Sequence, residues 1–203
     1  MIGVDGVPKI PYELGFQIDS VTDGLHISNF LMESADAAIT GDALLPQLPT
    51  LIDADINLQL RGGNIQRFQG LTNALALPLS PFSAELTMRG NVSGNPDTLK
   101  AEFVVGMVKG SVCGRLSANT DYIDSTLDYA LRSPSIDTLV DLFGITLAKS
   151  DPLMAEGSIE FQKTGMQLKD LTVKIGDNEI RASGLIPSEN TSKPIKINIR
   201  SSG

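Results

Sequence analysis

Catalysis at neutral pH commonly depends on histidine, cysteine or paired carboxylates, yet this chain of 203 residues has one histidine and one cysteine. Cys113 cannot form an internal disulfide, and Cys113 and His26 together supply too few ligands for a Cys/His zinc site. A serine triad would need His26 as its base, but His26 falls on the polar side of an alternating run. We therefore expect a solvated histidine in a strand, and a buried, inert thiol at Cys113 among small residues.

Three aspartates, Asp121, Asp124 and Asp128, could together hold a cation. Their spacing lacks the glycine-containing pattern of a calcium loop, so a solvated acidic face is the preferred interpretation. The sequence also contains no Gly-x-Ser-x-Gly elbow, no dinucleotide fingerprint and no Walker loop. We expect no catalytic residue, no metal site and no cofactor, and an enzyme is the third-ranked alternative.

Charge and composition exclude several partners. The chain has 24 acidic and 16 basic residues and a formal net charge of −8, which argues against nucleic acid and against a polybasic membrane-surface module. A hydrophobic share of 41% without tryptophan predicts a core of aliphatic side chains, in one large or two small domains. No signal peptide and no continuous apolar span is visible, so the chain as given is expected to be soluble.

Alternation of polar and apolar residues is the main pattern along the chain. It is present in residues 53–61, 85–89 and 194–200, and residues 170–175 and 179–184 alternate on either side of a glycine turn. A period of two is typical of strands with one buried and one wet face. The sequence therefore predicts a mostly β protein with an antiparallel sheet, one face of which is dry.

One stretch has helical spacing instead. Apolar residues recur at helical intervals in residues 134–144, where Ser133 is the expected N-cap, Pro134 the first helical residue and Gly144 the stop. We expect one short amphipathic helix that closes an end or a side of the sheet. The alternative is a helix that docks on a membrane, which its acidic face disfavours.

Glycines mark a recurring hairpin. Two segments carry glycines eight residues apart, namely Gly106 with Gly114 and Gly176 with Gly184. A looser third copy follows when residues 24–30 are laid over 165–171, with its hairpin two residues shorter and ending at Gly41. A hairpin cannot bury its apolar face alone, so such copies must stack. The alternative is that hairpins with this glycine spacing recur by chance in an all-β protein.

The C-terminal stretch, residues 152–184, resembles the AsmA family of bacterial envelope proteins, which repeat a phrase of leucine, a polar residue, aspartate-leucine, a glycine turn, an alternating strand and a glycine. Residues 89–99 are similar to another recurrent phrase of that family, and the helix expected at 134–144 falls where such proteins often carry one. The resemblance covers most of residues 12–200. The chain departs from the family at both ends, since it lacks the N-terminal membrane anchor and much of the usual length, and the resemblance therefore implies a soluble segment of a longer member.

The resemblance implies an elongated, strongly curved antiparallel sheet, a β-groove of repeated hairpins with one short helix. It implies a single segment over residues 1–203, with possible sub-lobes at 1–80 and 81–203. It also implies a non-enzymatic role in phospholipid transport between inner and outer membrane and in outer-membrane biogenesis. The location would be periplasmic, with the parent protein anchored in the bacterial inner membrane. The expected partners are a phospholipid or another acyl-chain lipid, and an envelope protein.

Strand parity then gives the residues expected to line such a groove: Ile56, Leu58, Leu60, Phe103, Val105, Leu171, Val173, Ile175, Ile180 and Ala182. An aliphatic lining suits acyl chains, which need an apolar surface and few hydrogen bonds. For each of these residues, a closed core filled by the protein's own side chains is an equally good interpretation. The alternative function is a structural or protein-interaction β module that docks an envelope partner through its sheet edges, without lipid.

Overall fold

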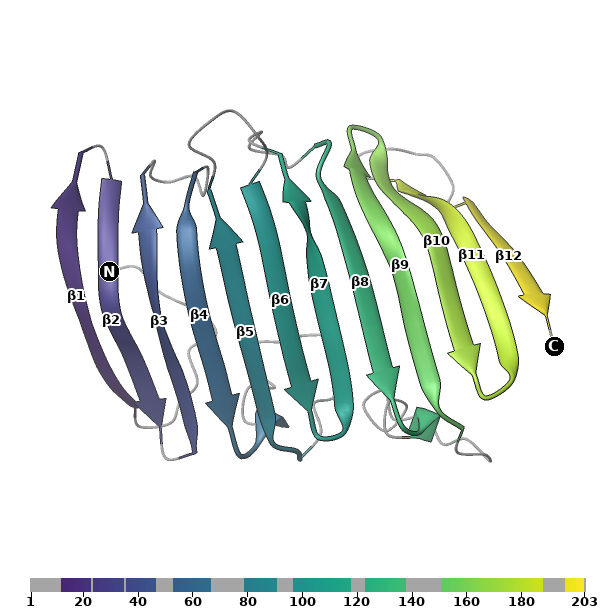
Figure 1. The fold of residues 1–203 in the computed structure, drawn as a ribbon, viewed down its shortest axis with the longest axis horizontal. Helices are drawn as coiled ribbons and strands as arrows, with labels where there is room; N and C mark the ends of the chain where they lie inside the picture. The colour runs from purple at the N-terminus through teal and green to yellow at the C-terminus, as the bar shows by residue number, and fades with distance from the viewer. Residues whose placement is uncertain are drawn as a thin grey trace.

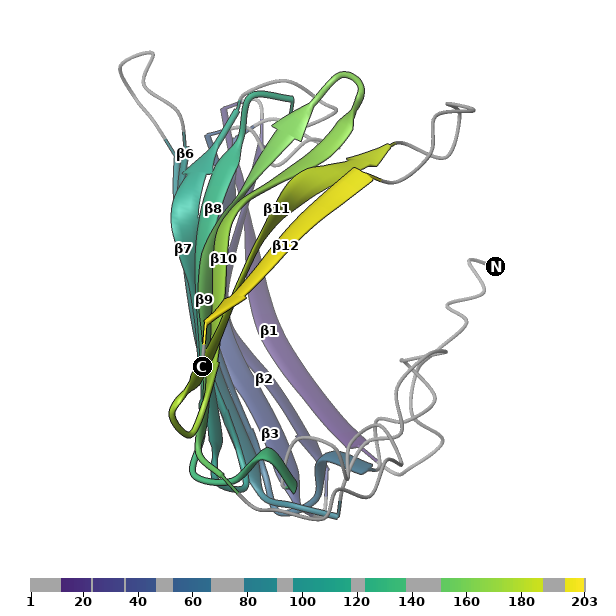
Figure 2. The same ribbon diagram turned by 90° about the vertical axis from the view of Figure 1, so that its right-hand side faces the viewer.

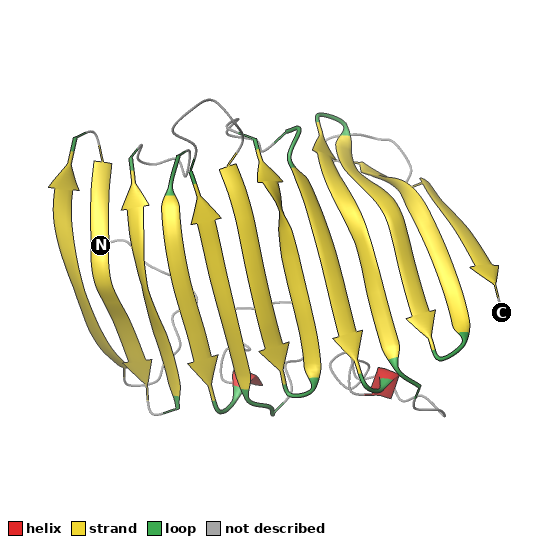
Figure 3. Ribbon diagram, viewed as in Figure 1, coloured by secondary structure: helices red, strands yellow, loops and turns green. Residues whose placement is uncertain are grey.

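Twelve antiparallel strands form one sheet in the computed structural model of the chain, and each strand pairs with its neighbours in sequence (Figure 1). The structure describes residues 12–22, 24–34, 36–46, 53–66, 79–90, 97–117, 123–137, 151–187 and 196–202. The strands are β1 (Tyr12–Val21), β2 (Gly24–Ser34), β3 (Ala37–Leu45), β4 (Asp55–Gly62), β5 (Phe82–Arg89), β6 (Asp97–Val105), β7 (Val108–Leu116), β8 (Thr126–Ser133), β9 (Leu153–Gln162), β10 (Gly165–Ile175), β11 (Asn178–Pro187) and β12 (Lys196–Ser202). Almost no helix accompanies them in these ranges (Figure 3).

The predicted β class and antiparallel pairing are confirmed. The hairpin expected over residues 170–184 is β10–β11, in which Ile175 pairs with Asn178. Its turn uses Gly176 at a φ of 58°, a conformation that glycine adopts without steric cost. β4 pairs with β5 from Ile56 to Gly62, so the sheet continues without a break from β1 to β12.

The sheet bends moderately, less than the strongly curved sheet that the resemblance implies. Figure 2 shows the lower end of β1 and the upper end of β12 both turned to the right, so that the two end strands are inclined in opposite directions. β2 and β10 each carry a β-bulge, at which Asn29 has a φ of 53° and Asp170 a φ of 48°. A bulge adds one residue to a strand and bends it locally, and asparagine and aspartate tolerate positive φ better than most residues.

The sheet divides into three blocks of four strands, and the pairing register of the first block recurs in the third. The first strands of the three blocks, β1, β5 and β9, begin at Tyr12, Phe82 and Leu153, so the blocks are nearly equal in length. Every β1–β2 pair recurs at the equivalent place between β9 and β10, from the first pair to the last and including the bulge. The β2–β3 pairs recur in the same way between β10 and β11.

This register corrects one alignment drawn from the glycines. Ala43 pairs with Ile27 as Gly184 pairs with Leu168, so Ala43, not Gly41, occupies the position of Gly184. The first hairpin is therefore not two residues shorter than the last. Gly41 meets a different requirement, because a Cβ added there would lie 2.2 Å from the backbone oxygen of Asn57. Glycine spacing alone could not separate these two roles.

The expected helix is described only at its first residues. Ile136 and Asp137 have helical backbone, and residues 138–144 lie outside the described ranges. The amide of Asp137 donates a hydrogen bond of 3.1 Å to Oγ of Ser135. The N-cap is therefore Ser135, and the prediction of Ser133 as the cap is wrong because β8 continues through Ser133.

Few side chains are fully buried, as a single-layer sheet requires. The buried hydrophobic residues of the described ranges are Ala54, Phe82, Met88, Val108 and Leu153. The prediction of a buried thiol at Cys113 is wrong, since this residue is exposed. Its partners in register are Lys100 and Asp128, so it belongs to the polar face of the sheet. His26 is half-buried in β2 and lies opposite Asp19.

Candidate functional site

One face of the sheet carries three adjacent rows of side chains without a single charged residue. Residues that lie directly opposite one another on neighbouring strands share a face, so the register gives each row. From β1 to β12 the first row is Leu14, Met32, Ile39, Leu60, Ala84, Phe103, Gly110, Leu131, Ala155, Val173, Ile180 and Ser201. We call this side of the sheet the apolar face.

The other two rows run beside it. The middle row passes through Leu58, Val112 and Tyr129. The outer row starts at Ile18 and ends at Ile197, and it is aliphatic along its whole length apart from Met88 and two glycines. Such a surface offers apolar contact and few hydrogen-bonding groups.

The register brings all ten predicted lining residues to the apolar face. They come from four strands: Ile56, Leu58 and Leu60 from β4; Phe103 and Val105 from β6; Leu171, Val173 and Ile175 from β10; Ile180 and Ala182 from β11. None of them is among the fully buried residues, and Ile180 is 37% exposed. The apolar face therefore stays accessible at every predicted position.

The two bulges keep the apolar face continuous. Ile27 and Phe30 stand three positions apart in β2, which in a regular strand would place them on opposite faces. The extra residue at the Asn29 bulge returns Phe30 to the apolar face, where it pairs with Gly41. The bulge at Asp170 does the same for β10. Parity counted from the sequence alone cannot detect such a switch.

Aromatic rings lie against glycines on neighbouring strands. A Cβ added to Gly110 would lie 2.1 Å from Cζ of Phe103, and one added to Gly157 would lie 2.8 Å from the hydroxyl oxygen of Tyr129. The rings therefore occupy the space that a side chain at each glycine would take. Partial burial raises the pKa of the Tyr129 phenol. Sequence reasoning missed these glycines, because their partners are known only once the register is known.

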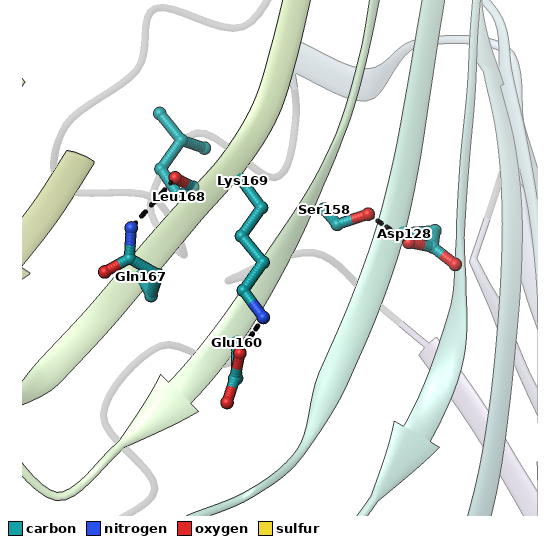
Figure 4. Close-up of polar contacts among 6 residues, drawn as sticks. All are labelled: Asp128, Ser158, Glu160, Gln167, Leu168 and Lys169. Carbon is teal, nitrogen blue, oxygen red and sulfur yellow. Dashed lines mark hydrogen bonds and ion pairs between the residues drawn. The ribbon is translucent and has the colours of Figure 1, made fainter. Parts of the chain in front are cut away.

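The opposite face is polar and held by side-chain pairs. Figure 4 shows Lys169 paired with Glu160 and the Ser158 hydroxyl donating a hydrogen bond to the Asp128 carboxylate. The hydrogen bond from Lys169 holds the pKa of Glu160 below its ordinary value. These polar pairs span β8 to β10 on the solvent-exposed polar face of the sheet.

Replacing Lys169 by glutamine should raise the pKa of Glu160, which an NMR titration of the side-chain carboxyl measures. A carboxylate with a lowered pKa in the folded state stabilises the fold above the ordinary glutamate range, and this contribution is lost as the pH falls. Below pH about 4.3 the wild type should therefore lose stability more steeply than Lys169→Gln. Lys163→Gln, in the β9–β10 turn, is the control. An unchanged Glu160 titration in Lys169→Gln would contradict the assignment.

A hollow of about 660 Å³ lies mostly among polar side chains of β3 to β8, not over the centre of the apolar face. Its lining includes three cations and two carboxylates, Arg61, Lys109, Arg132, Glu85 and Glu102. Lys109 and Arg132 lie directly opposite each other. Five charged side chains in this lining disfavour acyl chains, and most of the predicted lining residues lie elsewhere, so this hollow is not the predicted groove.

The predicted aspartate series gains no support as a cation site. Asp121 lies outside the described residues, Asp124 is in a turn, and Asp128 accepts the hydrogen bond from Ser158. In the part of the chain that the structure describes, no three acidic, cysteine or histidine side chains are grouped to hold a metal ion. Within the same ranges, no helix has the length and apolar character to cross a bilayer.

Comparison with known proteins gives no relative. No protein-family model, no curated protein and no solved structure matches the chain. The chain's own residues form an uncharged face and a polar face on one layer of strands.

Proposed function

We propose that the apolar face binds the acyl chains of a phospholipid, or of another acyl-chain lipid, and shields them from water without catalysis. The observation that carries the proposal is the set of three uncharged rows on the apolar face of a twelve-stranded sheet. None of the ten predicted lining residues on this face is fully buried. Each methylene that moves from water to an apolar surface contributes about 0.8 kcal/mol. Head groups would stay in water.

The dimensions of the apolar face suit this role. Strands lie about 4.8 Å apart, so a row that crosses twelve strands is roughly 50 Å long. The hydrocarbon core of a bilayer is about 30 Å thick. The rows therefore exceed the length over which lipid tails extend in a membrane, and an acyl chain could remain on the face along its whole length.

The cellular part of the proposal depends on the resemblance of residues 152–184 to the AsmA phrase. On this basis the chain would belong to the periplasm, in a protein anchored in the bacterial inner membrane. It would support phospholipid transport to the outer membrane and outer-membrane biogenesis, along a β-groove of repeated hairpins. The recurrence of the pairing register between the first and last four-strand blocks is in keeping with a stacked conduit.

Detergent-free purification followed by mass spectrometry tests the proposal. We expect phospholipid to co-purify with the folded protein, and the delipidated protein to bind a fluorescent fatty acid saturably. A folded protein without co-purified lipid and without saturable binding would contradict lipid binding. That outcome would favour the structural or protein-interaction module.

A further inference from the structure

The two outer strands of the sheet leave apolar side chains in water. β1 and β12 each pair with only one described strand. On β1, Leu14 is 52% exposed, and Phe16 and Ile18 are each 50% exposed. On β12, Ile197 is 48% and Ile199 is 67% exposed. A long edge strand with apolar side chains favours pairing with a further strand.

The sheet already contains two junctions of the kind that would pair these edges. At β4–β5, the fourth strand of the first block pairs with the first strand of the second, with Ile56 opposite Met88 and Leu58 opposite Leu86. At β8–β9, the equivalent positions are occupied by Leu127 opposite Ile159 and by Tyr129 opposite Gly157. In both junctions, therefore, equivalent positions of the fourth strand of one block and the first strand of the next lie opposite each other.

We propose that β12 of one copy of this chain pairs with β1 of a second copy in this same register. Applied to the two edges, the register sets Ile197 opposite Ile18, Ile199 opposite Phe16 and Ser201 opposite Leu14. The most exposed isoleucine of β12 thus meets the aromatic ring of β1.

The polar sides of the two edges are also compatible. Asn198 falls opposite Gln17, at the position where Asp128 faces Ser158 in the β8–β9 junction. Arg200 falls diagonal to Glu13, within reach of a long side chain. Opposite charges at such positions stabilise a strand pair, and like charges would oppose it.

The pairing is head-to-tail, so it leaves a free β1 edge at one end and a free β12 edge at the other. Such heterologous contacts produce open-ended assemblies instead of closed dimers. The apolar face of one copy would continue into that of the next. The proposal depends only on the edges, so it can fail while lipid binding holds, and the reverse.

Two variants, each with one edge blocked, test the proposal when they are studied alone and mixed with each other. Phe16→Lys blocks the β1 edge, and Ile199→Lys blocks the β12 edge. Sedimentation velocity of the wild type should show mass that grows with protein concentration, and each variant alone should be monomeric. An equimolar mixture should form a one-to-one dimer, because each variant keeps the edge that the other has lost.

Each other outcome overturns the proposal. A monomeric wild type at about 100 μM would exclude the contact at any useful affinity. Dimers of either variant alone would show pairing between two like edges. A monomeric mixture of folded variants, checked by circular dichroism, would show that growth of the wild type has another cause.

Cross-linking tests the register itself. In a Cys113→Ser background, a Gln17→Cys chain mixed with an Asn198→Cys chain should form a disulfide, because directly opposite residues stand within bridging distance. Asn198→Cys mixed with Glu13→Cys is the control, and preferential cross-linking of that pair would overturn the proposed register.

Discussion

Gly165→Ala is expected to lower the free energy of unfolding by about 3 kcal/mol or more. Gly165 has a φ of 137°, a backbone conformation that residues with a side chain rarely adopt. A Cβ added there would lie 2.2 Å from the backbone oxygen of Ile186. Backbone atoms cannot move aside as a flexible side chain can. Gly24 holds the equivalent place in β2, where an added Cβ would lie 2.2 Å from the backbone oxygen of Leu45. Urea unfolding followed by circular dichroism measures the loss.

Gly15→Ala is the matched control, since a Cβ added at Gly15 in β1 meets nothing within 4 Å. We expect it to change the free energy of unfolding by less than about 0.5 kcal/mol. Equal urea midpoints for Gly165→Ala and Gly15→Ala would show that crowding at the β10–β11 end does not limit the fold.

Leu60→Glu is expected to weaken fatty-acid binding at least tenfold, or about 1.4 kcal/mol. Leu60 belongs to the first apolar row, where it lies between Ile39 and Ala84. A carboxylate there would have to give up water as an acyl chain covers it, and an unpaired charge resists this strongly. Fluorescent fatty-acid titration of the delipidated protein measures the change.

Gln59→Glu, one residue away on the same strand, is the control because it adds the same charge on the polar face. It should leave binding within about twofold, or 0.4 kcal/mol. Ile180→Glu tests the same face at a residue that is 37% exposed, where a charge costs the fold less. If folded Leu60→Glu and Ile180→Glu bind as the wild type does, the acyl chains do not lie on the apolar face.

Parity in the sequence was sufficient to predict the sheet and the common face of ten residues, because a period of two needs no tertiary information. The same signal places Cys113 on the polar face. Lys109 and Arg115 share its parity in β7, whereas Val112 and Leu116 belong to the other face. Small neighbours suggested burial, but the charged residues at even spacing indicate the polar face.

Other features depend on tertiary pairing and could not be read from the sequence. The bulges at Asn29 and Asp170 are defined by two residues facing one on the neighbouring strand. The end of β8 at Ser133 depends on pairing with Leu153, which lies far along the chain. Ser133 therefore pairs within the sheet instead of capping the helix, and Ser135 is the N-cap.

The order of the strands has a consequence for folding. Because every described strand pairs only with its neighbours in sequence, the sheet is close to a one-dimensional array, in which stability is a sum of strand terms and nearest-neighbour terms. In hairpins such as β6–β7 and β10–β11 these contacts close short loops, which favours folding that begins at a hairpin. A defect in one hairpin would then open the array locally, with the hairpins on either side remaining paired.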